Sequence, residues 1–131
     1  MAPNKLILII SIISNILFAQ RKSSPETFTT KNKKAIELYK QGENYLAQRL
    51  VVEAEHLLKQ AIKKDEKFAE PYFLLAQLNK YNYDLQAAKN YFETGLTLQP
   101  DNPKFSIFYY DVAEIYLREG NYDDAFKNAN K

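Results

Sequence analysis

The sequence repeats itself with a period of about 34 residues, the distance from Ala54 to Ala88. Side chains of similar kind recur around these two alanines. The matching positions are Leu38, Gly42, Tyr45, Ala54, Leu58 and Ala61, then Tyr72, Ala76, Asn79, Ala88, Phe92 and Gly95, then in part Tyr109, Ala113, Tyr116 and Ala125. A fixed period of about 20 to 50 residues is typical of solenoids, whose units are too small to bury an apolar face alone. The repeat therefore predicts a row of stacked units rather than one closed core.

Each unit carries two helical patterns. Leu38, Gly42 and Tyr45 follow the i, i+4, i+7 spacing of one helical face, and the positions from Ala54 to Ala61 repeat that spacing. Two amphipathic helices therefore form one hairpin. We expect the small residues at positions 42, 54, 61, 76, 88 and 95 to let paired helices approach closely. A large residue at these positions would overpack the contact by about 1–3 kcal/mol.

These segments resemble tetratricopeptide repeats (TPRs), whose unit has an aromatic, a small residue, a tyrosine, an alanine and a proline at set positions. The matching residues are Tyr72, Leu75, Ala76, Ala88, Phe92, Gly95 and Pro100 in the second unit and Tyr109, Val112, Ala113, Tyr116, Gly120, Tyr122 and Ala125 in the third. The first unit is the most degenerate. The resemblance implies an all-α fold, a right-handed α-solenoid of stacked antiparallel helical hairpins.

The units are placed at residues 35–68, 69–102 and 103–131. The inserted segment from Pro103 to Phe105 lengthens the connection before the third unit, so Ala125 follows Ala88 later than the regular period requires. Two prolines close together, Pro100 and Pro103, predict a turn followed by a new helix start. The last helix is truncated at Lys131 compared with its counterparts in the other units.

Residues 1–19 have the character of a secretory signal peptide. Lys5 precedes a short apolar stretch at 6–18, and Ala19 is a small residue at a plausible cleavage point. The predicted location is the periplasm, the outer membrane or the cell surface. An uncleaved anchor in the inner membrane, formed by residues 6–18, is the alternative. Residues 20–34 are assigned to a linker and the start of the first helix, with 20–31 as a flexible lead.

Composition and motifs do not favour an enzyme or a nucleic-acid binder. The chain has 18 basic and 16 acidic residues, a formal charge of +2, and the two signs are interspersed rather than gathered into a basic stripe. It contains no cysteine and a single histidine, His56, whose neighbours suggest neither a nucleophile nor a metal site. Asp123 and Asp124 are expected to open the last helix. We therefore predict no catalytic residues, no metal and no cofactor.

The TPR resemblance implies a concave groove lined by the first helix of each hairpin. Its fifth position holds an aromatic residue in every unit, and rigid aromatics are frequent interface anchors. The residues predicted to bind a partner are Tyr39, Glu43, Phe73, Gln77, Tyr81, Tyr110 and Glu114. TPR chaperone adaptors hold a C-terminal carboxylate with lysine and asparagine at the fifth and ninth positions. Tyrosine, phenylalanine, glutamate and glutamine stand there instead, which argues against that use.

The predicted function is an exported protein-interaction scaffold that binds a peptide or a helix of a partner protein. A signal peptide followed by such repeats resembles the TPR region of bacterial envelope proteins with an OmpA-like, peptidoglycan-binding module. One alternative is a docking arm of a larger envelope protein, enzyme or secretion machine that continues beyond residue 131. Another is a self-assembling module that uses the exposed terminal repeat. Membrane contact is expected only through an uncleaved signal or a downstream domain.

Overall fold

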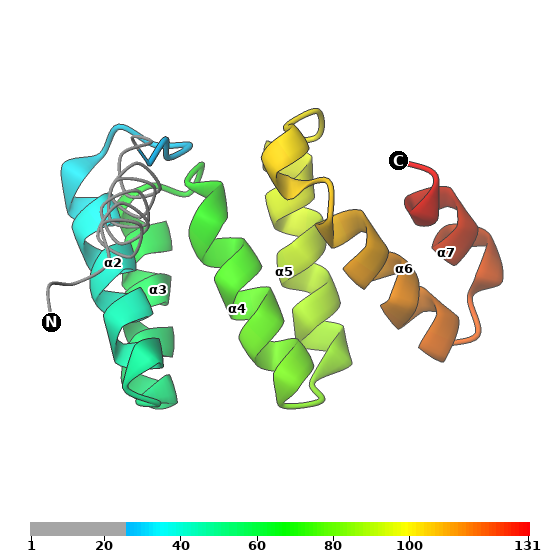
Figure 1. The fold of residues 1–131 in the computed structure, drawn as a ribbon, viewed down its shortest axis with the longest axis horizontal. Helices are drawn as coiled ribbons and strands as arrows, with labels where there is room; N and C mark the ends of the chain where they lie inside the picture. The colour runs from blue at the N-terminus through cyan, green and yellow to red at the C-terminus, as the bar shows by residue number, and fades with distance from the viewer. Residues whose placement is uncertain (1–25) are drawn as a thin grey trace, which may run out of the picture.

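The structure, a computed structural model, describes residues 26–131. This part of the chain is all-α, with six helices joined by short connections (Figure 1). The helices are α2 (Lys33–Ala47), α3 (Val51–Lys64), α4 (Ala69–Tyr81), α5 (Leu85–Leu98), α6 (Phe108–Arg118) and α7 (Tyr122–Ala129), with a 3-10 turn, η1 (Pro103–Phe105), before α6. The predicted signal peptide and inner-membrane anchor lie outside the described residues.

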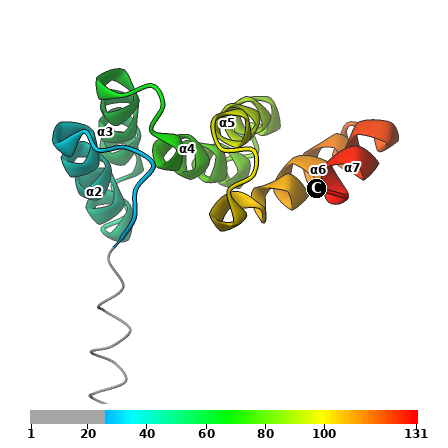
Figure 2. The same cartoon turned by 90° about the horizontal axis from the view of Figure 1, so that it is seen from above.

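The six helices pair into antiparallel hairpins: α2 with α3 (hairpin 1), α4 with α5 (hairpin 2) and α6 with α7 (hairpin 3). The hairpins stand side by side in a row, with hairpin 1 at one end and α7 at the other (Figures 1 and 2). Hairpins 1 and 2 meet where α3 contacts α4 (seam 1), and hairpins 2 and 3 meet where α5 contacts α6 (seam 2). The predicted fold is confirmed.

The turn inside each hairpin places one residue in the left-handed conformation. These residues are Arg49, Tyr83 and Gly120, with φ angles of 62°, 61° and 75°. They recur with the repeat, since Arg49 and Tyr83 are one regular period apart and Gly120 follows after the lengthened connection. Glycine adopts this conformation freely, whereas a side chain crowds the following carbonyl at a cost of about 1–2 kcal/mol. The same turn is therefore relaxed in hairpin 3 and strained in the other two.

Small residues bring the paired helices together, as the sequence predicted. A Cβ atom on Gly42 would lie 3.1 Å from the side chain of Leu58, and one on Gly95 would lie 2.8 Å from the ring of Phe73. The alanines at 54, 61, 76 and 88 are fully buried. Hairpin 2 leaves less space for an added Cβ atom than hairpin 1, and the neighbour of its glycine is an aromatic ring.

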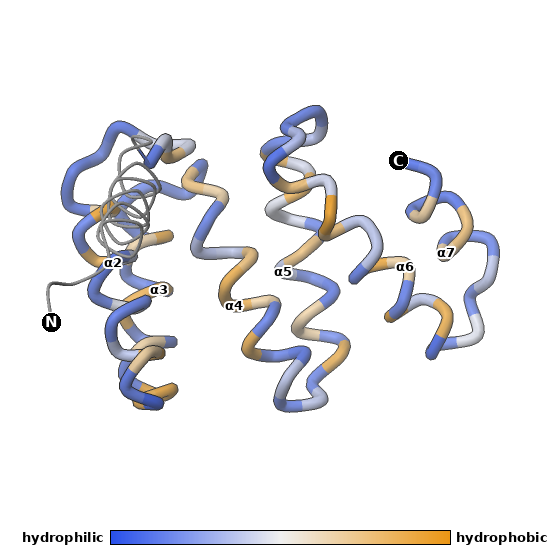
Figure 3. Tube along the Cα trace, in the orientation of Figure 1, coloured by the Kyte–Doolittle hydropathy of each residue, from blue (hydrophilic) through white to orange (hydrophobic). Residues whose placement is uncertain are grey.

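The buried residues form two separate clusters rather than one. Hairpin 1 has its own cluster, made of Ala35, Leu38, Ala61 and Phe68. Hairpins 2 and 3 share a second, larger cluster, made of Ala69, Phe73, Ala76, Ala88, Phe92, Leu96, Phe105, Tyr109, Val112 and Ile115. Figure 3 shows how apolar and polar residues alternate along the helices, so that each helix has a side to bury. Hairpins 2 and 3 therefore form one packed unit, and hairpin 1 is joined to it.

Residues 26–32, which we call the strap, differ from the flexible lead predicted for residues 20–31. The Thr29 hydroxyl accepts a hydrogen bond from the backbone N–H of Ala69 at 2.8 Å and donates one to Glu70 at 2.5 Å. The ring of Phe28 contacts Tyr39 and Phe68 edge-on. Polar composition suggested a free segment, but these few residues are tied to α2 and α4.

The strap also supplies a helix cap. Helices α2, α5 and α7 begin after Asn32, Asp84 and Asn121, whose side chains accept hydrogen bonds from backbone N–H groups of the first turn. Helix α4 begins after Phe68, which has no such side chain. The Thr29 hydroxyl takes this role from outside the helix.

In the part of the chain that the structure describes, no helix is long and apolar enough to cross a membrane.

Candidate functional site

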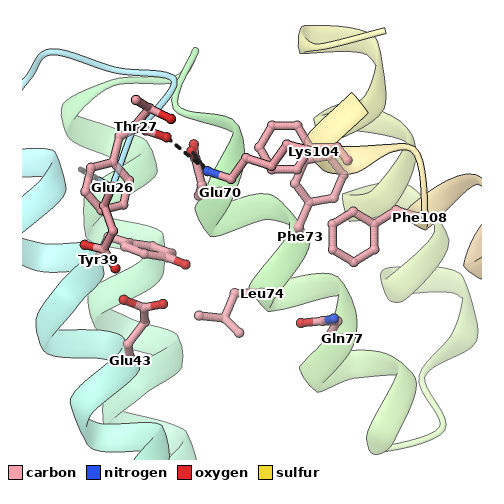
Figure 4. Close-up of a pocket in the computed structure, with 12 residues that line it drawn as sticks. Glu26, Thr27, Tyr39, Glu43, Glu70, Phe73, Leu74, Gln77, Lys104 and Phe108 are labelled. Atoms are coloured by element: carbon pink, nitrogen blue, oxygen red, sulfur yellow. Dashed lines mark hydrogen bonds and ion pairs between the residues drawn. The ribbon is translucent and has the colours of Figure 1, made fainter. Parts of the chain in front are cut away.

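A cleft of about 560 Å³ lies between α2 and α4 and is closed at one end by the strap and η1 (Figure 4). The residues that line it are Glu26, Thr27, Phe28, Tyr39, Glu43, Glu70, Phe73, Leu74, Gln77, Lys104, Phe105 and Phe108. Four of the seven predicted groove residues are among them: Tyr39, Glu43, Phe73 and Gln77. Tyr39 and Glu43 lie on the α2 side of the cleft, and Phe73 and Gln77 lie on its α4 side.

Tyr39 forms the aromatic wall on α2. It is half-buried, and its ring centroid lies 5.8 Å from that of Phe28 and 5.4 Å from that of Phe68, both edge-on. Burial, with the Glu43 carboxylate adding to it, raises the pKa of the Tyr39 hydroxyl far above its ordinary value. The hydroxyl therefore stays protonated and neutral, as a hydrogen-bond donor beside an acidic side chain.

Phe73 is the main departure from the predicted groove. Only 3% of it is exposed, so it is part of the core rather than a free anchor for a partner. Its ring stacks on Phe105 and on Phe108 at centroid distances of 4.5 and 4.4 Å and rests on Gly95. The inserted segment at 103–105 brings Phe105 over this position. The insertion therefore covers the aromatic that the repeat pattern left open.

Glu70 organises the closed end of the cleft. Its carboxylate is 5% exposed and accepts hydrogen bonds from the Thr29 backbone N–H at 3.1 Å and from the Lys104 ammonium at 2.8 Å. Lys104 also donates to the backbone carbonyl of Thr27 at 3.1 Å. A buried carboxylate requires such partners. Glu70 thus ties α4, the strap and η1 together (Figure 4).

The open part of the cleft is acidic and amphipathic. Glu43 and Gln77 are exposed on facing helices, with the half-buried Leu74 between them (Figure 4). Three carboxylates and one ammonium line the cleft, and that ammonium is already bound to Glu70. Glu43 forms no ion pair with the other residues from 26 to 131. The site can therefore accept an apolar side chain and a positive charge together.

The other three predicted groove residues lie elsewhere. Tyr81 is 84% exposed and lines a second cleft of about 590 Å³ with Gln77, Lys80, Tyr83, Leu85 and Arg118. Tyr110 is 62% exposed on α6 and lines neither cleft. Glu114 is taken up by ion pairs with Lys80 at 2.5 Å and Arg118 at 2.6 Å. Gln77 lines both clefts, so the cleft that Tyr81 lines adjoins the one that Tyr39, Glu43 and Phe73 line.

The ion pairs at Lys80 join hairpins 2 and 3. The Lys80 ammonium bridges Asp111 at 2.6 Å and Glu114 at 2.5 Å. Its partial burial opposes the charged form, but the hydrogen bonds to the two carboxylates outweigh this and raise the pKa of Lys80. The same bonds, with those from Arg118, lower the pKa of Glu114. These side chains are occupied within the fold.

Sequence reasoning missed Phe28, Lys104, Phe105 and Phe108 as cleft residues. All four lie outside the repeat pattern or at its edge, so periodicity could not place them. The signal that was available is the insertion itself, because Phe105 ends the inserted segment and Phe108 follows it closely. Among residues 26–131 no group of three His, Asp or Glu side chains is placed to hold a metal. His56 is exposed and lies 2.7 Å from the Gln60 amide.

No protein-family model matches this sequence, and no curated protein matches it significantly. Solved structures do match. MamA is 26% identical with a TM-score of 0.61, over 74% of this chain and 54% of the MamA chain. The second TPR of Spaghetti (RPAP3), bound to the HSP90 peptide SRMEEVD, is 13% identical with a TM-score of 0.65, over 76% of this chain and 89% of that one.

The type III secretion translocator chaperone SycD of Yersinia enterocolitica is 16% identical with a TM-score of 0.58, over 72% of this chain and 68% of SycD. The hairpin pairing of this chain matches these structures. The protein is a TPR-like helical-repeat protein. It spans about half the length of the two matching MamA chains. Because RPAP3 and SycD share so few identical residues with this chain, the likeness to them concerns the fold alone.

Proposed function

We propose that this protein is a protein-interaction module that binds a peptide segment or a helix of a partner in the cleft between α2 and α4. The observation that carries this proposal is the joint presence of Tyr39, Glu43 and Gln77 around one open cleft. A concave site with apolar walls and a few placed polar groups is the usual form of a binding site. The similarity to a TPR solved with a bound peptide supports the same use here.

The chemistry of the cleft favours a ligand that is apolar and basic. Glu43 offers an exposed carboxylate beside Tyr39 and Leu74, which suits a lysine or arginine next to an apolar side chain. An acidic segment would instead meet the Glu43 carboxylate, with Lys104 already paired with Glu70 and Lys40 with Glu26. We therefore expect the cleft to reject the acidic C-terminal peptides that carboxylate-clamp TPRs bind.

The experiment compares matched synthetic peptides that differ only in carrying lysine, glutamine or glutamate at the same positions. Binding to the full chain is measured by fluorescence anisotropy. The lysine peptide should bind most tightly, and Glu43→Gln should weaken it by about two- to fivefold, the usual effect of one partly exposed ion pair. Glu37→Gln is the matched control, because Glu37 is exposed on α2 and pairs with Lys34 away from the cleft. Equal affinities of all three peptides would contradict the proposal that they bind in this acidic cleft.

A second candidate function, self-association, is favoured by the surface of α7. Tyr122 and Phe126 lie one turn apart on this helix and are 70% and 74% exposed. The repeat equivalent of Phe126 is Lys89, which binds Glu119 of the following hairpin at 2.6 Å. In hairpin 2 the position equivalent to Phe126 therefore contacts the next hairpin of the row.

The proposed neighbour is α7 of a second copy. Head-to-tail stacking is less suitable, because the exposed side of α2 at the other end carries Lys34, Glu37 and Gln41 bonded to one another. Sedimentation equilibrium over a range of concentrations should show a dimer, and Phe126→Lys, which installs the residue of hairpin 2, should abolish it. A monomer at every concentration contradicts this second candidate.

The proposed place of action is outside the cytoplasm, in the periplasm, the outer membrane or the cell surface. This part of the proposal is supported only by the sequence of residues 1–22, with its basic start, apolar stretch and small residue at position 19. Mass spectrometry of the protein recovered from cells tests it. An N-terminus at Gln20 is expected, whereas an intact N-terminus in the membrane fraction would favour the anchor formed by residues 6–18.

A further inference from the structure

The strap lies in the cleft as a bound peptide would. It has no helix or strand structure, and its residues Glu26, Thr27 and Phe28 form part of the cleft lining. Figure 4 shows it passing over Tyr39 and toward Glu70. The end of the cleft nearest η1 is thus filled by a segment of the same chain.

Phe28 is the aromatic anchor of the strap. Its ring lies edge-on to Tyr39 at 5.8 Å and to Phe68 at 5.9 Å, and we call these two rings, which also contact each other, the aromatic box. The ammonium groups of Lys40 and Lys104 lie 5.3 and 5.9 Å from the Phe28 ring centroid, within the range of cation–π attraction. The surroundings of Phe28 therefore suit an aromatic side chain both in shape and in charge.

Thr29 adds the backbone and hydroxyl contacts. Its N–H and hydroxyl donate to the two oxygens of Glu70 at 3.1 and 2.5 Å, and its hydroxyl accepts from the Ala69 N–H at 2.8 Å. Thr30 donates a further hydrogen bond to Asp65. The site at this end of the cleft thus binds an extended segment with an aromatic residue followed by a hydroxyl residue.

The burial of the strap increases from Glu26 to Thr30. Glu26 and Thr27 are exposed, Phe28 and Thr29 are half-buried, and Thr30 is buried, with 7% exposed. The ion pair from Glu26 to Lys40 joins side chains that are both more than half exposed, so it contributes little. The space beside the strap is large enough for a second segment to enter.

We infer that the strap is an intramolecular ligand that a partner segment must displace from the aromatic box. This inference rests on the proposed function, since it concerns the same cleft. The competing ligand is an extended segment with an aromatic residue followed by serine or threonine. The apparent affinity of such a ligand is reduced by the fraction of molecules in which the strap occupies the box.

The test uses a fluorescent synthetic peptide with the strap sequence, residues 26–32, added to the full chain. Wild-type protein should bind it poorly, and the double variant Phe28→Ala, Thr29→Gly should bind it at least about tenfold more tightly because the box is empty. A peptide with alanine in place of the phenylalanine is the control and should not bind. Equal affinity of the wild type and the double variant overturns the inference, as does no binding to either.

A second measurement avoids any loss of stability in the double variant. Hydrogen exchange at the Thr29 amide, which donates to Glu70, reports the docking of the strap directly in the wild type. Excess strap peptide should speed this exchange as it displaces the native strap. Unchanged exchange at saturating peptide contradicts displacement.

The lysine peptide of the previous section separates this inference from the proposed function. If it binds the wild type and the double variant equally, the cleft is a binding site but the strap does not compete for it. If it binds neither while the strap peptide binds the double variant, the box exists and the proposed function fails.

Discussion

The two seams of the row join similar hairpins by different means. At seam 1 the strap, which lies outside the repeats, supplies Phe28, which packs in the aromatic box of Tyr39 and Phe68, and Thr29, which bonds to α4. At seam 2 the stack of Phe73, Phe105 and Phe108 and the ion pairs of Lys80 and Lys89 come from the repeats and the insertion between them. Only seam 2 lies within one continuous buried cluster.

This difference shows that the repeat fixes the hairpin but not the strength of the joint between hairpins. The joint depends on residues that periodicity does not control. We therefore expect substitutions of exposed residues at seam 2 to change the free energy of unfolding little, and substitutions of its buried residues to change it strongly. Seam 1 should respond mainly to changes in the strap.

Loss of the Phe73 side chain should have the largest effect. Truncation of a fully buried phenylalanine costs about 3–5 kcal/mol, so Phe73→Ala should lower the free energy of unfolding by this amount. The half-buried Phe28 at seam 1 should cost clearly less when changed to alanine. Urea unfolding followed by circular dichroism measures both. Tyr110→Ala, at an exposed aromatic on α6, is the control and should change stability by less than about 0.5 kcal/mol. Equal losses at Phe73 and Phe28 would erase the distinction between the seams.

A methyl group at Gly95 should have the next largest effect. Its Cβ would lie 2.8 Å from the Phe73 ring, which is held by Phe105 and Phe108, so Gly95→Ala should destabilise by about 1–3 kcal/mol. Gly42→Ala is the matched variant in hairpin 1. Its Cβ would meet the more adaptable Leu58 at 3.1 Å, and alanine gains up to about 1 kcal/mol in helix propensity. Thermal unfolding should therefore show a large loss for the first and little change for the second, and the reverse order would contradict this account.

Removal of the Thr29 hydroxyl tests the cap at seam 1. Thr29→Val keeps the shape but leaves the Ala69 N–H without its acceptor, so it should cost about 0.5–2 kcal/mol. The loss should be local, with faster hydrogen exchange at the start of α4 and unchanged exchange in α6. Thr27→Val, at an exposed strap position, serves as the control. Fast exchange spreading equally over all three hairpins would show that seam 1 is not a separate joint.

The smallest effect should be the pH dependence of seam 2. Lys80 and Arg118 lower the pKa of Glu114 below its usual value of 4.5. A carboxyl with a lowered pKa in the folded state stabilises that state above the unfolded pKa, and this contribution is lost as pH falls through the folded pKa. The stability difference between wild type and Glu114→Gln should therefore be present at neutral pH and shrink in acid below the ordinary glutamate pKa.

Solvent screening keeps this difference small, because the Glu114 side chain is 43% exposed. Denaturant unfolding across the pH range measures it. Glu37→Gln is the control away from both seams. A difference that persists at low pH would mean that the charge of Glu114 contributes nothing to the joint.

Much of the hairpin architecture could be predicted from the sequence because it depends on local spacing. The faces around Gly42 and Ala88 follow from helical geometry repeated along the chain. The cleft walls at Tyr39 and Glu43 followed from the same pattern. These features require no knowledge of distant contacts.

The burial of Phe73 and the position of the strap could not be predicted in this way. Phe73 is covered by Phe105, and the path of a short insertion with prolines is not set by periodicity. The strap is a short polar segment, and nothing in its composition indicates that Thr29 would meet Glu70, which lies far along the chain on α4. Both depend on contacts between units, which a one-dimensional pattern does not contain.

The division of the interior into two clusters has a mechanical consequence for the cleft. Its α4 side belongs to hairpins 2 and 3, which share one cluster, so we expect α4 to keep its position relative to these hairpins. Its α2 side belongs to hairpin 1, whose separate cluster reaches α4 through Phe68, so we expect that side to shift more easily than the α4 side. We therefore expect the width of the cleft to adjust to ligands of different thickness while hairpins 2 and 3 keep their arrangement.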